Sequence, residues 1–193
     1  MTVRWRAGLL SVVGVIALAL ITGAFFAASG LYNIAADVPH AVFVHDFLGY
    51  VRDRSIAAHA ADIRVPRLDN KDMIAMGASH YDAMCTGCHL APGMEENEMR
   101  PGMNPKPPLL AEGDVGTPAE TFWVVKHGIK MAGMPAWGIT HSDEEIWNIV
   151  AFLQLLPKLS PAEYRALVAQ SGVHHEHDGH DDQMDMTHMD MSH

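Results

Sequence analysis

The feature that most constrains this chain is the pentapeptide Cys85-Thr86-Gly87-Cys88-His89, which contains its only two cysteines. Two thiols three residues apart, followed directly by an imidazole, have the spacing of a c-type haem attachment site. Each thiol can form a thioether with one haem vinyl group, and the histidine can bind the iron from the proximal side. We therefore expect one covalent haem, attached at Cys85 and Cys88, with His89 as an axial ligand.

Two other kinds of site contain closely spaced cysteines. A thioredoxin-like redox pair does not need the histidine and expects a βαβ setting, of which the sequence gives no sign. A zinc site with four protein ligands would need a second pair of cysteines or histidines at ligand spacing, and residues 69–157 contain no such pair. Both alternatives fit the pattern less well than haem attachment.

Residues 1–30 are predicted to form a transmembrane anchor. Arg4 and Arg6 precede an apolar stretch over residues 7–29, which is longer than the roughly 20 residues that cross a bilayer. The arginines predict a cytoplasmic N-terminus and export of everything after residue 30. The alternative is a cleaved secretory signal, with Ala27-Ala28-Ser29 as its cleavage site. Both interpretations place the cysteines outside the cytoplasm.

Residues 31–68 are predicted to connect the anchor to the next domain. Apolar side chains recur at roughly helical spacing between about residues 40 and 63, which indicates an amphipathic helix. Two placements suit such a helix, along the membrane surface or against the domain that follows. The segment before Pro66 is expected to be extended, because the residue before a proline avoids helical geometry. We place the domain boundary at residue 69.

Residues 69–157 are predicted to form an all-α domain, since no stretch alternates as a strand would. A loop rich in proline and glycine over residues 93–118 separates the first two helices, and long loops in compact domains tend to be functional. A short trailing helix is expected over residues 158–170. The three main helices are expected to begin at Asp69 or Asn70, at Thr117 or Pro118, and at Ser142, where Glu145 completes a capping box.

Between the second and third helices lies the run Gly133-Met134-Pro135-Ala136-Trp137-Gly138. Over residues 69–157 the chain resembles class I cytochromes c. The resemblance rests on this run and the Cys-x-x-Cys-His motif, together with an attachment helix, a proline-bearing loop and a closing helix. The resemblance implies that Met134 is the distal axial ligand of the haem, opposite His89. It also implies that the carbonyl of Pro108 accepts a hydrogen bond from the other ring N–H of His89.

The same resemblance places the crossing of the first and last helices at Gly77, Tyr81 and Phe152. It further implies haem attachment on the outer side of a bacterial inner membrane. We therefore expect a single-pass inner-membrane protein with its haem domain in the periplasm.

Three other residues compete with Met134 for the distal position. Met131 lies in the same loop, and His127 and His141 flank it, so that either histidine would give a bis-histidine haem. Met134 is favoured because the following proline restricts the backbone and matches the loop of the family.

Two protein ligands on the iron leave no coordination position for oxygen or a substrate. The implied function is outer-sphere electron transfer by a carrier rather than catalysis, although the chain also suits the cytochrome subunit of an oxidoreductase complex. The expected partners are redox proteins: an oxidase, a reductase or a dehydrogenase. A haem enzyme with an open distal site would require Met134 to be absent or labile, and the loop shows no distal acid–base pair.

Residues 171–193 form a separate polar tail that is predicted to be disordered, because almost none of its residues can build a core. The formal charge of the chain is −10, and six of its 23 acidic residues lie in the last 20 residues, which contain no Lys or Arg. The rest of the chain has no basic stripe of the kind that binds nucleic acid.

Imidazole suits copper, nickel and zinc, whereas clustered thioethers select Cu(I). The tail is therefore predicted to bind copper weakly, and a merely solvating tail is the alternative. If the tail were the primary functional element, the protein would instead handle periplasmic copper or act as a haem sensor. The candidate copper ligands are His174, His175, His177, His180, Met184, Met186, His188, Met189, Met191 and His193.

Overall fold

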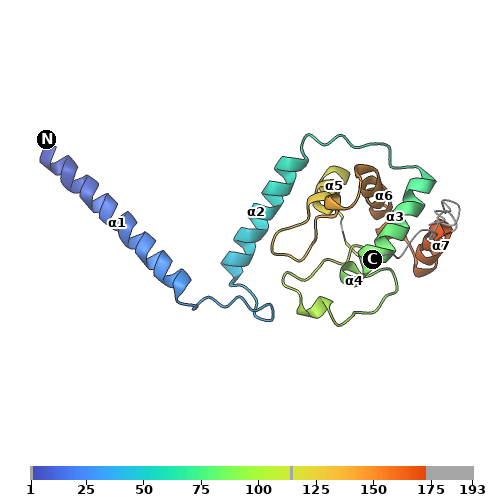
Figure 1. Cartoon of the computed structure of the whole chain (residues 1–193), viewed down its shortest axis with the longest axis horizontal. Helices are drawn as coiled ribbons and strands as arrows, with labels where there is room; N and C mark the ends of the chain where they lie inside the picture. Colours follow the sequence, from blue (N-terminus) through green and yellow to red (C-terminus); the bar gives the residue numbers. More distant parts are fainter. Residues whose placement is uncertain (1, 114, 173–193) are drawn as a thin grey trace, which may run out of the picture. The chain divides into compact units, whose positions relative to one another are not determined.

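The structure, a computed structural model, describes residues 2–113 and 115–172. Within these residues every regular element is helical and no strand is present (Figure 1), so the predicted all-α fold is confirmed. The chain forms two compact units, of which the first extends to His40 and the second begins at Ala41.

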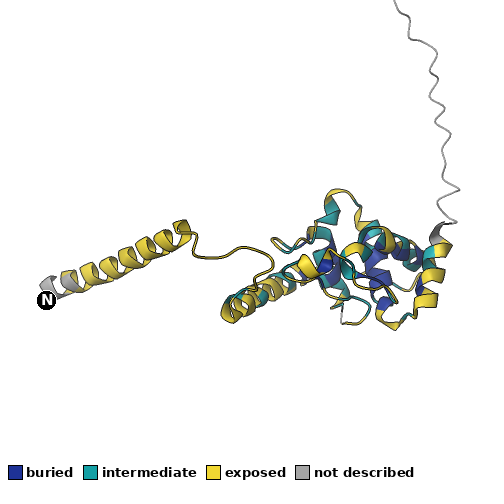
Figure 2. Ribbon diagram, turned by 90° about the horizontal axis from the view of Figure 1, so that it is seen from below, coloured by how far each residue is buried: buried dark blue, intermediate teal, exposed yellow. Residues whose placement is uncertain are grey.

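The first unit consists of helix α1, Thr2–Ala28, and the segment that follows it. Its segment Gly8–Ala28 has a mean hydropathy of 2.5 and is long and apolar enough to cross a membrane. The side chains of this segment are exposed (Figure 2), as expected for a helix whose apolar surface is not covered by protein.

In the second unit, three helices begin where the sequence predicts. Helix α3, Lys71–Met84, is capped by Asn70, whose side chain accepts from the Asp72 N–H at 2.8 Å. Helix α5, Pro118–His127, and helix α6, Asp143–Leu153, each begin with a complete capping box, formed by Thr117 with Glu120 and by Ser142 with Glu145. Two 3-10 turns flank α6, Trp137–Ile139 before it and Leu156–Lys158 after it.

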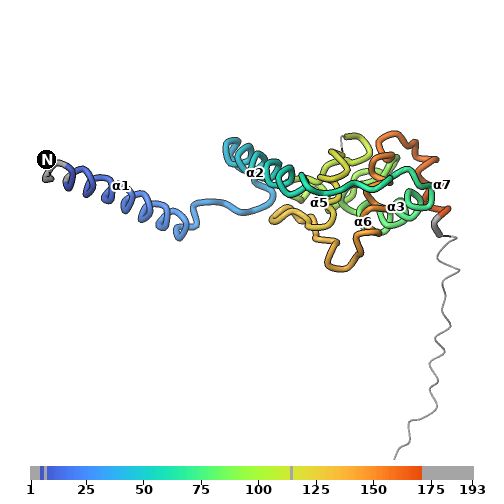
Figure 3. The backbone as a smooth tube through the Cα atoms, turned by 90° about the horizontal axis from the view of Figure 1, so that it is seen from above, coloured from blue at the N-terminus to red at the C-terminus, as the bar shows by residue number. Residues whose placement is uncertain are grey.

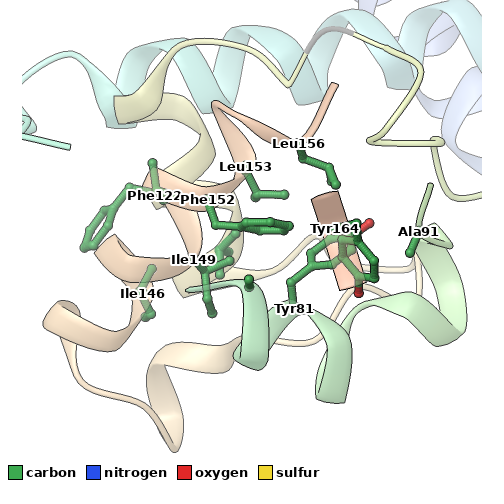
Figure 4. Close-up of a cluster of buried hydrophobic side chains, with 12 residues drawn as sticks. Tyr81, Ala91, Phe122, Ile146, Ile149, Phe152, Leu153, Leu156 and Tyr164 are labelled. Atoms are coloured by element: carbon green, nitrogen blue, oxygen red, sulfur yellow. The ribbon is translucent and has the colours of Figure 1, made fainter. Parts of the chain in front are cut away.

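Helices α3 and α6 cross at very close range, and the core is built around this crossing (Figure 4). A Cβ atom at Gly77 would lie 1.9 Å from the backbone oxygen of Asn148, so only glycine fits there. The rings of Tyr81 and Phe152, both fully buried, lie 5.3 Å apart between their centroids. The predicted crossing at Gly77, Tyr81 and Phe152 is therefore confirmed.

Helix α7, Pro161–Gly172, also packs on α3. The hydroxyl of Tyr164 donates to the Asp82 carboxylate at 2.6 Å, and its ring meets that of Tyr81 edge-on at 6.5 Å. This helix therefore ties the end of the described chain to the helix that leads into the cysteines.

Helix α2, Val42–Ala60, belongs to the second unit and packs against α5, as the tube in Figure 3 shows. Ala60 is buried, and the ring of His59 lies 5.3 Å from that of Trp123. Of the two placements that the sequence allowed for this helix, the structure shows packing on the following domain. The compact unit therefore begins before residue 69, where the sequence analysis placed the boundary.

Candidate haem site

The residues of the attachment motif lie on a helical path that continues from the end of α3. Cys85 is the C-cap of α3, and its N–H donates to the carbonyl of Tyr81 at 2.9 Å. The chain then forms the turn α4, Thr86–His89, in which the His89 N–H donates to the carbonyl of Cys85 at 2.8 Å. A helical path puts the two thiols, three residues apart, on one side of the turn, as attachment to a single ring requires.

The chain leaves this turn through Leu90, which has a positive φ of 58° although it is not glycine. Leu90 is buried, and its carbonyl accepts a hydrogen bond of 2.6 Å from the hydroxyl of Tyr81. Burial raises the pKa of Tyr81, so the hydroxyl remains a donor. Tyr81 therefore has a second role besides the helix crossing, because it holds the backbone just after His89 in an unusual conformation.

The imidazole of His89 is oriented by the proline-rich loop. Its Nδ1 lies 2.9 Å from the carbonyl oxygen of Pro108, and because a carbonyl only accepts, Nδ1 is the protonated nitrogen. Burial lowers the pKa of His89, and the nearby Arg100 cation lowers it further, against the opposing effect of the Pro108 hydrogen bond. The ring is therefore neutral near pH 7, with the lone pair of Nε2 available to a metal.

The two cysteines have the properties of attachment points rather than of a redox pair. Both thiols are free and partly buried. Burial, together with the neighbouring Cys88, raises the pKa of Cys85 to about 12. A reactive thiol in a redox pair needs a lowered pKa, so the environment of Cys85 does not favour the thioredoxin-like alternative.

The Met-Pro loop is closed by an antiparallel bridge between Ile129 and Met134, in which the Ile129 N–H donates to the Met134 carbonyl at 3.2 Å. Gly128, with φ of 64°, precedes the bridge, and a Cβ atom there would lie 2.5 Å from the Met134 oxygen. Met134 is half-buried and packs on the core, whereas Met131 is 98% exposed. The loop thus directs one methionine inward and the other into solvent.

The two histidines that flank this loop have neighbours of their own. His127 is exposed, and its ring lies 5.1 Å from that of Trp123 on the same helix. His141 lies 5.5 Å from the ring of Trp137 and 5.8 Å from that of His80. Both rings therefore pack against other side chains of the domain.

A cavity of about 360 Å³ lies beside His89. Its lining is mixed: Leu109, Ala111 and Pro161 are apolar, whereas Glu96, Arg100 and Glu112 are charged. Neither the two cysteines nor Met134 lines this cavity, so it is not by itself the place of a haem held between His89 and Met134.

Arg100 is the site residue that sequence reasoning missed. Its side chain is only 6% exposed, yet it donates to the carboxylate of Glu96 at 2.7 Å and to the carbonyl of Pro107 at 2.8 Å. Its Nε has no acceptor among the described residues, and a buried donor of this kind suits the carboxylate of a haem propionate. The sole sequence signal was the spacing of four between Glu96 and Arg100.

The residues present therefore fit a haem. The thiols, the imidazole and the inward methionine would supply its covalent and coordinating groups, and the buried arginine would suit its acidic edge. The family described as "Cytochrome C oxidase, cbb3-type, subunit III" matches residues 72–153. The chain contains a class I c-type cytochrome domain. No curated protein and no solved structure matches the chain.

The cytochrome domain accounts for the attachment helix, the proline-rich loop, the Met-Pro loop and α6. Together with the two cysteines in a Cys-x-x-Cys-His motif, it makes the chain a haem electron carrier with covalently bound haem c. Helices α1, α2 and α7 lie outside the matched residues. The predicted copper ligands, from His174 onward, lie outside the residues that the structure describes.

Proposed function

We propose that this protein is a membrane-tethered periplasmic cytochrome that carries single electrons between redox partners. In this proposal Cys85 and Cys88 bind one haem through thioethers, His89 is the proximal ligand and Met134 the distal one. The observation that carries the proposal is the 2.9 Å hydrogen bond from His89 Nδ1 to the Pro108 carbonyl. This bond fixes the tautomer, so that Nε2 is the nitrogen that would bind iron.

The choice of Met134 over its competitors rests on burial. Met134 packs against core residues while Met131 projects into solvent, and the Ile129 bridge keeps the loop in this arrangement. The neighbours of His127 and His141 hold their rings against tryptophans. A thioether opposite an imidazole favours ferrous iron and raises the reduction potential relative to a bis-histidine site.

When bound, the haem supplies a one-electron change of iron valence. The protein groups keep their positions during this change, because Pro108 holds the imidazole and the Ile129–Met134 bridge holds the distal loop. With both axial positions filled by protein, neither oxygen nor a substrate has a coordination site. The arrangement therefore favours a carrier over a haem enzyme.

The anchor in this proposal is the segment Gly8–Ala28, which could cross the membrane by its length and composition. Arg4 and Arg6 before it favour a cytoplasmic N-terminus, which puts the second unit in the periplasm. Among an oxidase, a reductase and a dehydrogenase as partners, the name of the matching family, an oxidase subunit, favours an oxidase.

The tail would add copper binding to the carrier, a role supported by its mixture of six histidines and four methionines. Deleting residues 174–193 separates the two readings of the chain. A carrier keeps its electron-transfer rate after the deletion, whereas a protein whose main function is copper handling or sensing loses that function. A tail that binds copper no more tightly than a control with Met and His replaced would exclude copper.

The main test is an optical redox titration of the purified protein, followed by addition of carbon monoxide to the reduced form. The proposal predicts a well-positive midpoint potential, the red-region charge-transfer band of methionine-ligated ferric haem, and no binding of carbon monoxide. The variant Met134→Ala should lose the band, lower the midpoint and bind carbon monoxide. The matched control Met131→Ala should behave as the wild type. If Met131→Ala alone opened the haem, the ligand assignment would be wrong.

A further inference from the structure

Helix α2 is partly buried against the cytochrome domain and partly exposed. Its C-terminal part packs on the cytochrome domain, where Ile56 is half-buried, Ala60 is buried and His59 lies against Trp123. On the rest of the helix, six large apolar side chains remain exposed: Val42 by 75%, Phe43 by 76%, Phe47 by 65%, Leu48 by 50%, Tyr50 by 65% and Val51 by 46%. Figure 2 shows the helix exposed along most of its length.

Four of these residues form one stripe, and Val42 and Leu48 lie to either side of it. Positions 43, 47, 50 and 51 are separated by four, three and one residues, which places them on one face of a helix with 3.6 residues per turn. Ile56, His59 and Ala60 fall on the opposite face by the same geometry. Packing on α5 therefore leaves this apolar stripe uncovered.

Arg54 continues the stripe by one further turn. Its neighbour Arg52 is paired with Asp53 at 2.7 Å, and His45 is paired with Asp46 at 3.1 Å. Arg54 is exposed and makes no ion pair among the described residues. The stripe thus combines two phenylalanines, a tyrosine and a valine with a cation free to meet an anionic group.

We propose that this stripe of α2 docks on the surface of the membrane that α1 spans, with Arg54 facing anionic lipid headgroups. The inference rests on the anchoring role of α1 given above. Thirteen residues separate the end of α1 at Ala28 from the start of α2 at Val42, and such a segment reaches at most about 45 Å. The stripe is therefore held within reach of the bilayer, which keeps the effective concentration of lipid high.

The chemistry of the stripe also fits lipid better than protein. Aromatic and aliphatic side chains on one helical face can lie in the membrane interface, buried by roughly 5–10 Å. The long side chain of Arg54 beside them can extend its charged end to the headgroups. A stable protein interface needs roughly 800 Å² from each partner, and a stripe one helix wide is narrow for that.

The test uses the full haem-loaded chain in lipid nanodiscs, one chain per disc, made of phosphatidylcholine with or without phosphatidylglycerol. A nitroxide is attached at Phe47→Cys, on the stripe, or at Asp53→Cys, the control on the flank of the same helix. The wild-type chain should take up no label, because the proposed function places both native thiols in thioethers. Uptake of label by the wild type would count against that function and not against docking.

Docking predicts that the label at position 47 loses accessibility to a water-soluble nickel complex several-fold, whereas the label at position 53 stays accessible. Phosphatidylglycerol should increase this protection, and Arg54→Gln should remove the increase. The haem absorption spectrum of each variant checks that it is folded. Equal accessibility at both positions in both lipids would overturn the docking alone.

Two other outcomes would also contradict the proposed docking of α2 on the membrane. Protection at position 47 that appears only with two chains per disc would mean that a second copy covers the stripe, and the proposal would be wrong. A chain that fails to co-elute with the discs would overturn both the anchor and the docking.

Discussion

Replacing Gly77 by alanine should weaken the whole domain. The added Cβ would lie 1.9 Å from the backbone oxygen of Asn148 and 2.9 Å from the Cβ of Phe152. Ordinary van der Waals contact begins at 3.4 Å, so the axes of α3 and α6 must move apart by about 1.5 Å. Such a gap removes much of the dispersion energy between the side chains of the two helices. A backbone carbonyl cannot rotate away as a side chain can.

The cost of such overpacking lies at the upper end of its usual range, about 3 kcal/mol. Alanine returns about 1 kcal/mol through its better helix propensity. The expected net loss is therefore about 2 kcal/mol, or a fall in Tm of roughly 10 °C for a domain of this size. Guanidinium denaturation followed by far-UV circular dichroism measures the free energy of unfolding directly.

Gly49→Ala is the matched control, because Gly49 also lies inside a helix but a Cβ there would have nothing within 4 Å. This control should be neutral or stabilising by up to about 1 kcal/mol. A Gly77→Ala variant as stable as the wild type would refute the close approach of the two helices.

Three further predictions follow from single contacts. Tyr164→Phe removes the 2.6 Å hydrogen bond to Asp82 and should lower the free energy of unfolding by about 1 kcal/mol. If the variant unfolds at the same denaturant concentration as the wild type, this bond does not hold α7. Arg100→Met removes two hydrogen bonds from a buried cation and should lower the free energy of unfolding by about 2 kcal/mol in chemical denaturation. Lys106→Gln removes the exposed partner of the same Glu96 and should lower it by less than about 0.5 kcal/mol. Hydrogen bonds from Ser142 and Ser160 lower the pKa of Glu145 and Glu163 below their ordinary value of 4.5, so this stabilisation is complete above that pH and is lost as the pH falls through the folded-state values. Glu145→Gln and Glu163→Gln should each flatten the acid limb of a plot of stability against pH, and an unchanged limb would show that other groups control it.

Features that depend on neighbouring residues could be predicted from the sequence. The capping box at Ser142 needs only four consecutive positions, and the attachment motif needs five. The crossing at Gly77 came instead from the resemblance to a family, since no local pattern says what a glycine in a helix will meet.

Features that join distant residues could not be predicted in the same way. The bond between Tyr164 and Asp82 spans 82 positions, and the burial of Arg100 depends on how the proline-rich loop folds back. The packing of α2 on the cytochrome domain likewise required knowing that Trp123 presents its ring to His59. Such contacts depend on tertiary packing, and the local sequence of one segment does not indicate which other segment it will contact.

The crossing of α3 and α6 affects the order in which parts of the domain unfold. Both proposed axial ligands lie in the stretch of sequence that joins these helices, but they are tethered differently. His89 directly follows an attachment cysteine, whereas Met134 lies in a loop closed by one bridge. Opening that loop would break the bridge and the packing of Met134 on the core but would leave the α3–α6 crossing in place, so it should occur as a local fluctuation while the helix pair stays intact. Under thermal or chemical stress the iron should therefore exchange its sulfur ligand reversibly, long before the cofactor or the fold is lost.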